Sequence, residues 1–339
     1  MRKNYLRTAL LSLFFISISV NAMLAQDSET VSYPTIKFDG TLKNKFEYAI
    51  DNDMSRFSVR NSRVGVRGNV NHFAGYRVQV ELSDEGSFKV LDLSGIISPA
   101  KGLTFTFGQT SIPLFNSYVV SPSDMMFANR TFLGKYFLST RDLGLNAKYK
   151  FNMGVVPTNL EFGVYNGNAI NDPVWKNNMS MGGRIELGSM DGLRFTAKVY
   201  DYPNNDSTHF LIYGADLRYE INNFKIETEV MKKDSRNDFN GDMLSYYIQS
   251  AYRFPVKSTF FDYFLPAARW DAIDANFDER GFDTNRLTIG LGLGFEEAKF
   301  SSIIRLDYEL YFVNNSMSIF NKNDQMDSDK ITVELLLTF

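Results

Sequence analysis

Residues 303–312, IIRLDYELYF, alternate between apolar and charged side chains from Ile304 to Leu310. One face of an extended strand would carry Ile304, Leu306, Tyr308, Leu310 and Phe312, and the other face Arg305, Asp307 and Glu309. Successive side chains of a β-strand point to opposite faces, so this stretch predicts a strand with one apolar and one charged face. A soluble sheet can show the same alternation. This segment alone does not show which of its two faces is exposed to water, so the other segments and their connections must be compared.

The same alternation recurs along the chain from Thr35 to Phe339, in about sixteen segments of roughly 8 to 16 residues. In residues 287–295, LTIGLGLGF, apolar residues alternate with Thr288 and three glycines, which a helix would not tolerate cheaply. The chain is 15% aromatic, with 30 Phe and 18 Tyr, yet its mean hydropathy is slightly negative. Apolar and polar residues are therefore interleaved, as an all-β protein with one wet and one apolar face requires.

The connections between these segments decide between a soluble sheet and a membrane barrel. The even-numbered connections are short: NVNHFAG, SPAKG, NMGVV, GSMDG, INN, PVKS and EEAK. The odd-numbered ones are mostly longer and more polar. Short turns on one side and longer loops on the other are typical of outer-membrane barrels. Since a sheet in lipid must close to satisfy its backbone hydrogen bonds, the sequence predicts a transmembrane antiparallel β-barrel of about sixteen strands.

The longest connection spans residues 111–140 and follows the fifth predicted strand, which makes it the third external loop. It contains Pro113, Pro122, Met125, Met126 and Phe127, an unusually apolar set for a loop in water. We therefore expect this loop to fold into the barrel and to constrict it.

The two ends of the sequence predict export. Arg2, Lys3 and Arg7 precede an apolar run that ends near small residues, so residues 1–25 are predicted to be a cleaved signal peptide and residues 26–339 the barrel. The last strand, ITVELLLTF, ends in Phe339, which resembles the signal read by the barrel assembly machinery. We expect a bacterial outer-membrane location, in contact with lipid and lipopolysaccharide.

Composition excludes several classes of function. The chain has no Cys, which rules out disulfides, thiolate metal sites and a Cys nucleophile. Its formal net charge of −3 gives no reason to expect a nucleic-acid partner. No nucleotide motif or plug domain is present, so no cofactor or energy coupling is expected.

Several segments resemble a known family. RFSVRNSRVGVRGNV at 56–70, GYRVQVELSD at 75–84 and FGQTSIP at 107–113 resemble the early strands of the phosphate-selective porin O and P family. The resemblance continues in RDLGL at 141–145, VYNGNA at 164–169 and FLPAARWD at 264–271. It implies a trimeric sixteen-stranded porin whose third external loop enters the lumen. Some members of that family prefer phosphate or other anions.

The densest basic cluster is Arg56, Arg60, Arg63 and Arg67 on one predicted strand. Arg56 and Arg60 occupy even-numbered positions, whereas Arg63 and Arg67 occupy odd-numbered ones, so the two pairs would point to opposite faces of a regular strand. A β-bulge or a strand end outside the membrane is therefore needed for all four to face the lumen. The candidate pore-lining and anion-lining residues are Arg60, Arg63, Arg67, Arg77, Arg130, Lys135 and Arg141. Guanidinium groups attract anions and can bind phosphate through two hydrogen bonds. The alternative is that these groups pair with carboxylates as struts, because the predicted lumen faces also carry Glu81, Asp142, Glu161, Glu186, Asp216, Glu227, Asp307, Glu309 and Glu334.

The function that fits best is a porin for passive diffusion of small hydrophilic solutes, with a preference for anions, phosphate among them. A structural or adhesive barrel is one alternative. A barrel hydrolase is another, with no catalytic residue assigned, because only His72 and His209 could act as a base and neither accompanies a Gly-x-Ser-x-Gly motif. Asp51 with Asp53, and Asp238 with Asn240 and Asp242, resemble parts of a calcium loop without its bidentate Glu. No metal ligand is therefore assigned.

Overall fold

The computed structural model describes residues 32–114, 120, 122–167, 173, 175–205, 208–236, 241–275, 281–297, 300–314 and 328–339. The chain divides into two compact units, Met1–Pro34 and Thr35–Phe339. The second unit holds the whole sheet. The predicted signal peptide, residues 1–25, lies outside the described residues.

The second unit is built almost entirely from strands. In chain order they are β1 (Lys37–Ala49), β2 (Met54–Asn69), β3 (Ala74–Asp84), β4 (Ser87–Ala100), β5 (Leu103–Ser111), β6 (Arg141–Met153), β7 (Val156–Tyr165), β8 (Ser180–Gly188), β9 (Gly192–Asn205), β10 (Thr208–Ile221), β11 (Phe224–Ser235), β12 (Met243–Tyr252), β13 (Phe254–Pro255), β14 (Tyr263–Asp274), β15 (Thr284–Glu297), β16 (Phe300–Val313) and β17 (Lys330–Thr338). Two short helices, η1 (Pro122–Asp124) and α3 (Phe132–Tyr136), lie in the connection between β5 and β6.

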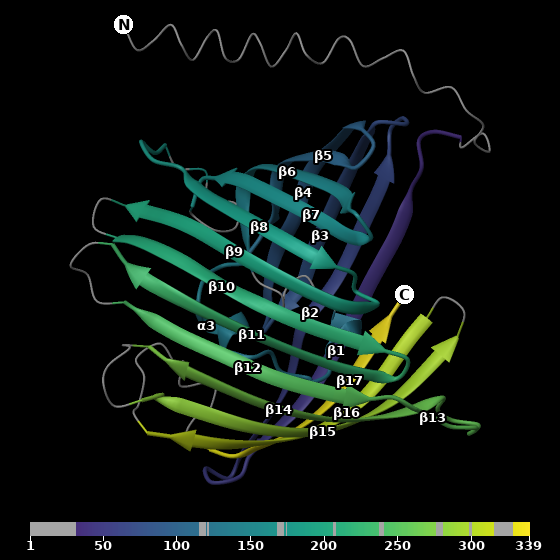
Figure 1. Cartoon of the computed structure of the whole chain (residues 1–339). Coiled ribbons are helices and arrows are strands. Elements are labelled where there is room, and N and C mark those ends of the chain that lie inside the picture. The colour runs from purple at the N-terminus through teal and green to yellow at the C-terminus, as the bar shows by residue number, and fades with distance from the viewer. Residues whose placement is uncertain are drawn as a thin grey trace, which may run out of the picture. The chain divides into compact units, whose positions relative to one another are not determined.

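The sheet closes on itself (Figure 1). Strand β1 pairs antiparallel with β17, from Thr41 opposite Thr338 to Ala49 opposite Lys330. β12 and β13 are separated only by Arg253 and both pair with β14, so they act as one interrupted strand. The described residues thus form a closed antiparallel barrel of sixteen strands, which confirms the predicted fold class. Closure leaves no unpaired edge, as a sheet in lipid requires.

The two faces of the barrel follow the alternation in the sequence. Large apolar side chains point outward and stay exposed, as in Phe38, Phe57 and Phe107 at 74%, 86% and 71%. Charged side chains such as Arg305 and Glu334 point inward and are buried. Among the described residues, no helix is long and apolar enough to cross a membrane.

Connections differ between the two ends of the barrel. We call the end where β1 joins β2 the loop side and the opposite end the turn side. The longest loop-side connections are residues 112–140, 166–179, 275–283 and 314–329, whereas most turn-side connections are two to four residues long. Two details differ from the sequence expectation. The turn-side connection 256–262 is longer than expected, and the loop-side connection 206–207 is shorter because β9 and β10 extend as a hairpin.

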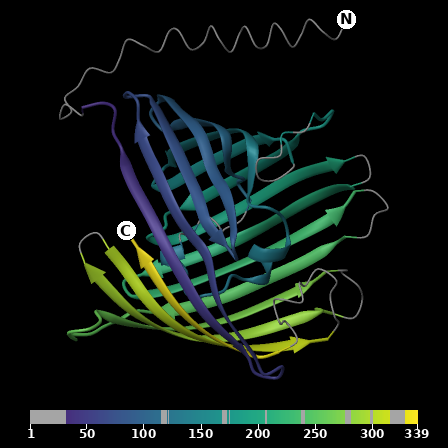
Figure 2. The same cartoon turned by 180° about the vertical axis from the view of Figure 1, so that it is seen from behind.

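The 112–140 loop folds into the barrel, as predicted, and α3 lies inside the ring of strands (Figure 2). The Thr131 side chain caps α3 by accepting a hydrogen bond from the Gly134 N–H at 3.2 Å. The helix packs against β12 and β14. Its Phe132 and Leu133 join a buried apolar cluster with inward side chains of the wall, including Tyr165 and Ile212. One part of the lumen is therefore filled and not open to water.

Gly290 on β15 makes room for this loop. A Cβ atom there would lie 2.6 Å from Asp307 Oδ1 and 3.0 Å from the ring of Phe127, a loop residue that is almost fully buried. Gly95 on β4 is the opposite case, because a Cβ atom at that position meets nothing within 4 Å.

We predict that Gly290→Leu destabilises the folded barrel by about 1–3 kcal/mol, as overpacking does. Gly95→Leu, the matched control, leaves stability unchanged. Samples of the purified protein are heated to a series of temperatures and then separated by gel electrophoresis, in which the folded barrel migrates faster than the unfolded chain. The measurement is the temperature at which the band of the folded barrel disappears. Equal transition temperatures for the two variants would show that the loop does not pack at Gly290.

Candidate functional site: the lumen and its constriction loop

Inward-facing charges of the wall hold the loop by its backbone. Asp307 Oδ2 accepts a hydrogen bond from the Ala128 N–H at 2.7 Å, and Asp271 Oδ2 accepts one from the Phe132 N–H at 2.9 Å. Loop carbonyl oxygens accept hydrogen bonds from wall cations: Lys43 to Ala128 at 2.6 Å, Arg269 to Asn129 at 2.9 Å, Arg286 to Arg130 at 2.8 Å and Arg305 to Met125 at 2.6 Å. Each bond joins a charged group to a peptide group, the stronger class of protein hydrogen bond.

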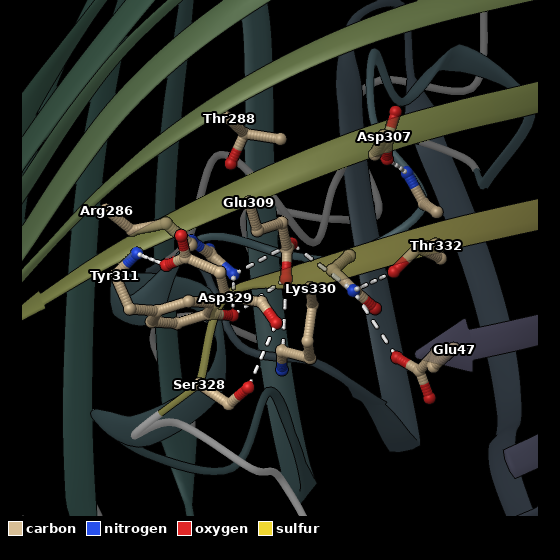
Figure 3. A network of polar contacts seen from close by, with 12 residues as sticks. Glu47, Arg286, Thr288, Asp307, Glu309, Tyr311, Ser328, Asp329, Lys330 and Thr332 are labelled. Carbon is tan, nitrogen blue, oxygen red and sulfur yellow. Dashed lines mark hydrogen bonds and ion pairs between the residues drawn. The ribbon is translucent and has the colours of Figure 1, made fainter. Parts of the chain in front are cut away.

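Glu309 is the centre of this network (Figure 3). Arg286 lies 3.1 Å from one of its oxygens, and the Tyr311 hydroxyl donates to the other at 2.7 Å. Lys330 lies 3.8 Å away, and the loop residue Asn129 donates to Glu309 at 3.3 Å. Arg269 also lies 3.8 Å from Glu309, which is fully buried, so several cations and hydrogen-bond donors of the wall and loop compensate its charge.

The described residues of the loop and wall leave two larger cavities in the lumen. The loop-side cavity has a volume of about 460 Å³ and reaches Glu47 and Arg56, which lie near the loop-side ends of β1 and β2. The turn-side cavity has a volume of about 730 Å³ and reaches Asp39 and Arg67 near the other ends of the same strands. Arg63 and Arg141 line both cavities, so they lie where the two spaces meet.

Basic residues dominate the lining of both cavities. Of the described residues, eleven Lys and Arg but only three carboxylates, Glu47, Glu81 and Asp84, line the loop-side cavity. Seven Lys and Arg and three carboxylates, Asp39, Glu161 and Glu186, line the turn-side cavity. Many carboxylates on the predicted lumen faces are absent from both linings, because Asp307, Glu309 and Glu334 lie behind the loop and Asp216 pairs with Arg194 and Lys198. The lumen is close to balanced in charge as a whole, but its open spaces are not.

At the junction, carboxylates orient the two arginines. Arg63 NH2 lies 3.4 Å from Glu81 Oε2, and Arg141 Nε donates to Asp92 Oδ1 at 2.7 Å. Arg141 also donates to Gln79 at 3.4 Å. The Nε atom of Arg63 is buried and has no hydrogen-bond partner among the described residues. Both guanidinium groups are thus fixed at one edge and still line the open cavities.

The structure places all seven sequence candidates on the cavity linings. Arg60, Arg130 and Lys135 line the loop-side cavity, Arg67 and Arg77 the turn-side cavity, and Arg63 and Arg141 both. Three of these arginines also form ion pairs with carboxylates: Arg60 with Asp84, Arg63 with Glu81, and Arg77 with Asp39 and Asp92. The two interpretations from the sequence are therefore compatible, because a paired arginine still faces the cavity.

A bulge lets the whole cluster of arginines on β2 face inward. The pairing of β2 with β3 shifts register on both sides of Ser62, and Asn61 adopts a positive φ of 56°. Asn61 is held there by Glu81 Oε1, which accepts hydrogen bonds from its backbone N–H at 2.7 Å and its side-chain amide at 3.0 Å. This bulge supplies the parity change that the spacing of Arg60 and Arg63 requires.

Sequence reasoning missed other lining cations. Lys43, Lys45, Lys89, Lys148, Arg184, Arg194, Arg286 and Lys330 also line the cavities. Their inward parity on each strand could have identified them, but no local cluster drew attention to them. It also missed the apolar cluster inside the barrel, because segments such as Phe210–Tyr213 are apolar on both faces.

The motifs that resembled parts of a calcium loop have other roles where they are described. The Asp53 carboxylate accepts a hydrogen bond from the Tyr48 hydroxyl, and Asp242 accepts one from the Ser235 N–H. Asp238 and Asn240 lie outside the described residues. Within the described part of the chain, no group of three or more His, Asp or Glu residues is arranged to hold a metal ion.

No family model matches the chain, and a search of curated proteins finds no match. The resemblance to the phosphate-selective porins therefore stays a prediction. Solved structures do match. One is OmpF of Salmonella typhi in complex with daunomycin, with a TM-score of 0.64 and 13% identity over 90% of this chain and 98% of that one.

Two further solved structures cover nearly the same span. An anion-selective porin from Comamonas acidovorans has a TM-score of 0.62 and 13% identity over 90% of this chain and 99% of that one. A loop-deletion mutant of OmpT, an outer membrane protein of Vibrio cholerae, has a TM-score of 0.61 and 14% identity over 91% and 100%. At such identities the likeness establishes the outer-membrane barrel fold.

We predict that Asp271→Ala destabilises the barrel by about 3–5 kcal/mol, because it removes the acceptor for the Phe132 N–H and one of two carboxylates paired with Arg286. The control is Asp234→Ala, which breaks a half-exposed pair with Lys232 and costs less than about 1 kcal/mol. Unfolding in urea, followed by tryptophan fluorescence in detergent micelles, measures both. A small effect at Asp271 would mean that these contacts do not hold the loop.

Proposed function

We propose that this barrel is an outer-membrane porin through which small hydrophilic solutes diffuse passively, with a preference for anions. The observation that carries the proposal is the pair of basic cavities that meet at Arg63 and Arg141. Rings of charged side chains at a narrow part of a pore select ions by sign, and low-dielectric walls concentrate their field.

The arrangement of the carboxylates supports the preference for anions. The buried carboxylates Glu334, Asp271 and Glu309 pair with three cations of the loop-side lining, Lys43, Arg286 and Lys330. The eight other Lys and Arg residues of that lining still outnumber its three carboxylates. The carboxylates that do line the cavities are outnumbered by cations in each. A permeating anion therefore meets a mostly positive wall from one end of the path to the other.

Phosphate belongs to the proposed solutes. Guanidinium groups can bind phosphate oxygens through two parallel hydrogen bonds, and the guanidinium groups of Arg63 and Arg141 line both cavities. Chloride and other small anions would follow the same path by charge alone.

The cellular setting belongs to the same proposal. Residues 1–25 would direct export and be removed, the barrel would lie in the outer membrane beside lipopolysaccharide, and Phe339 would be read by the barrel assembly machinery. A homotrimer is proposed by analogy, because one matching structure of the Vibrio cholerae OmpT is described as its trimer form.

Two other functions remain as alternatives to be tested. A structural barrel would conduct nothing, although its lumen contains the same two cavities. A hydrolase would need a base, and His209 lies 2.6 Å from Asp201 on the neighbouring strand at the loop side. Loss of any esterase or protease activity in His209→Ala would favour the hydrolase.

We predict that the double variant Arg63→Gln with Arg141→Gln lowers the preference for anions about two- to fivefold, because Glu81 and Asp92 then lose the cations that face them at the junction. Single channels in planar bilayers under a KCl gradient give the reversal potential. Arg253→Gln is the control, because this arginine pairs with Glu296 at the turn-side rim and lines neither cavity.

Wild-type channels should reverse near the chloride potential, the double variant should reverse closer to zero, and Arg253→Gln should match the wild type. Open channels that show no preference between anions and cations would reject the preference for anions and support a general porin. The absence of any conductance steps would reject the porin and favour the structural barrel.

A further inference from the structure

The loop-side cavity contains aromatic rings among its basic residues. Phe132 and Tyr136 lie one helical turn apart on α3, with ring centroids 6.3 Å apart, and Tyr311 of β16 lies 6.4 Å from Phe132. All three line the cavity, together with Leu138. Phe132 is almost fully buried, whereas Tyr136, Tyr311 and Leu138 are half-buried and keep surface open to the space. The rings thus form a continuous apolar strip on part of the cavity wall.

Each ring has a cation beside it. Arg286 lies 4.5 Å from the centre of Phe132, Lys330 lies 4.9 Å from that of Tyr311, and Lys135 lies 5.2 Å from that of Tyr136. These distances are within the range of cation–π contact. A planar ligand that lies against the strip would therefore hold an attached carboxylate close to positive charge.

A pore that selects by charge alone has no need of this strip. Apolar surface that faces water costs free energy, and inorganic anions gain nothing from an aromatic neighbour. Tyr136 and Leu138 pack against the buried apolar cluster on one side and keep surface open to the cavity on the other. The hydrogen bonds that anchor the loop come from backbone groups of residues 125–132 and do not need this open apolar surface. The strip has a use when the solute itself carries a ring.

We propose that the loop-side cavity is a binding site for aromatic carboxylates, which pause there before they pass the junction at Arg63 and Arg141. The inference rests on the proposed porin function and adds a class of substrate to it. The ring would pack against Tyr136 and Tyr311 while the carboxylate meets the cations beside these rings, Lys135 and Lys330, which line the same cavity. The cavity volume of about 460 Å³ lies within the usual range of small-molecule sites, about 300–1,000 Å³.

The test compares benzoate with acetate as blockers of the chloride current through single channels. Both are monovalent carboxylates, so charge alone predicts equal block. The proposal predicts that benzoate blocks at a concentration about fivefold lower, the scale of one aromatic contact. Cyclohexanecarboxylate, which is apolar without being aromatic, should lie between them.

Tyr136→Leu should remove most of the difference between the concentrations at which benzoate and acetate block the chloride current. The matched control is Tyr149→Leu on β6, which replaces a 46% exposed tyrosine stacked on Phe151 and lies outside both cavity linings. In this control variant, benzoate and acetate should block the chloride current at the same concentrations as in the wild type.

Equal block by benzoate and acetate in the wild type would overturn the inference and leave the porin intact. Equal block of Tyr136→Leu and the wild type by benzoate would also overturn it. Absence of chloride current in the wild type would be a failure of the proposed function itself. Because the comparison of the three acids uses the unmodified protein, it decides the question even where a variant does not fold.

Discussion

A strand inside a bilayer has no water to satisfy its backbone N–H and C=O groups, and the rest of this structure follows from that constraint. The pairing of β1 with β17 closes the sheet and leaves no edge in lipid. In a closed barrel, the alternating side chains of each strand point either to the outside or to the inside. The apolar ones face lipid, and the polar and charged ones are collected inside a tube too wide for wall side chains alone to fill.

The 112–140 loop supplies hydrogen-bond partners to charged side chains that are buried inside the barrel. Buried ions are costly unless each has a close partner, and the wall carries carboxylates and cations in comparable number. The loop offers peptide N–H groups to Asp271 and Asp307 and carbonyl groups to Lys43, Arg269, Arg286 and Arg305. Because the loop covers the carboxylates of β14, β16 and β17, the open space is lined mostly by cations, among them those of β2 and of the loop itself. A chain with a formal net charge of −3 can thus present a basic pore.

Much of this could be predicted from local patterns. Alternation as in residues 303–312 depends only on the strand and its two environments, so it predicted the strands, and the alternation of short and long connections predicted a membrane barrel. The inward loop followed from its apolar residues, and the spacing of Arg60 and Arg63 required either a bulge or a strand end outside the membrane. What could not be predicted is which wall carboxylates the loop would cover. That depends on contacts between residues far apart in the chain, such as Ala128 with Asp307, which no local pattern encodes.

The same contacts explain why the shape of the pore and its charge cannot be varied independently. Arg286 binds Asp271, Glu309 and the carbonyl of Arg130, and its guanidinium lies over the ring of Phe132. A change at this residue alters the compensation of two buried carboxylates, the position of the loop and the aromatic strip together. Residues at the junction are less constrained, because Arg63 and Arg141 contact β3 and β4 and none of the loop anchors. The charge that lines the cavities can therefore change at the junction through single substitutions, whereas changes to the size of the lumen require several residues of the loop and wall to change at once.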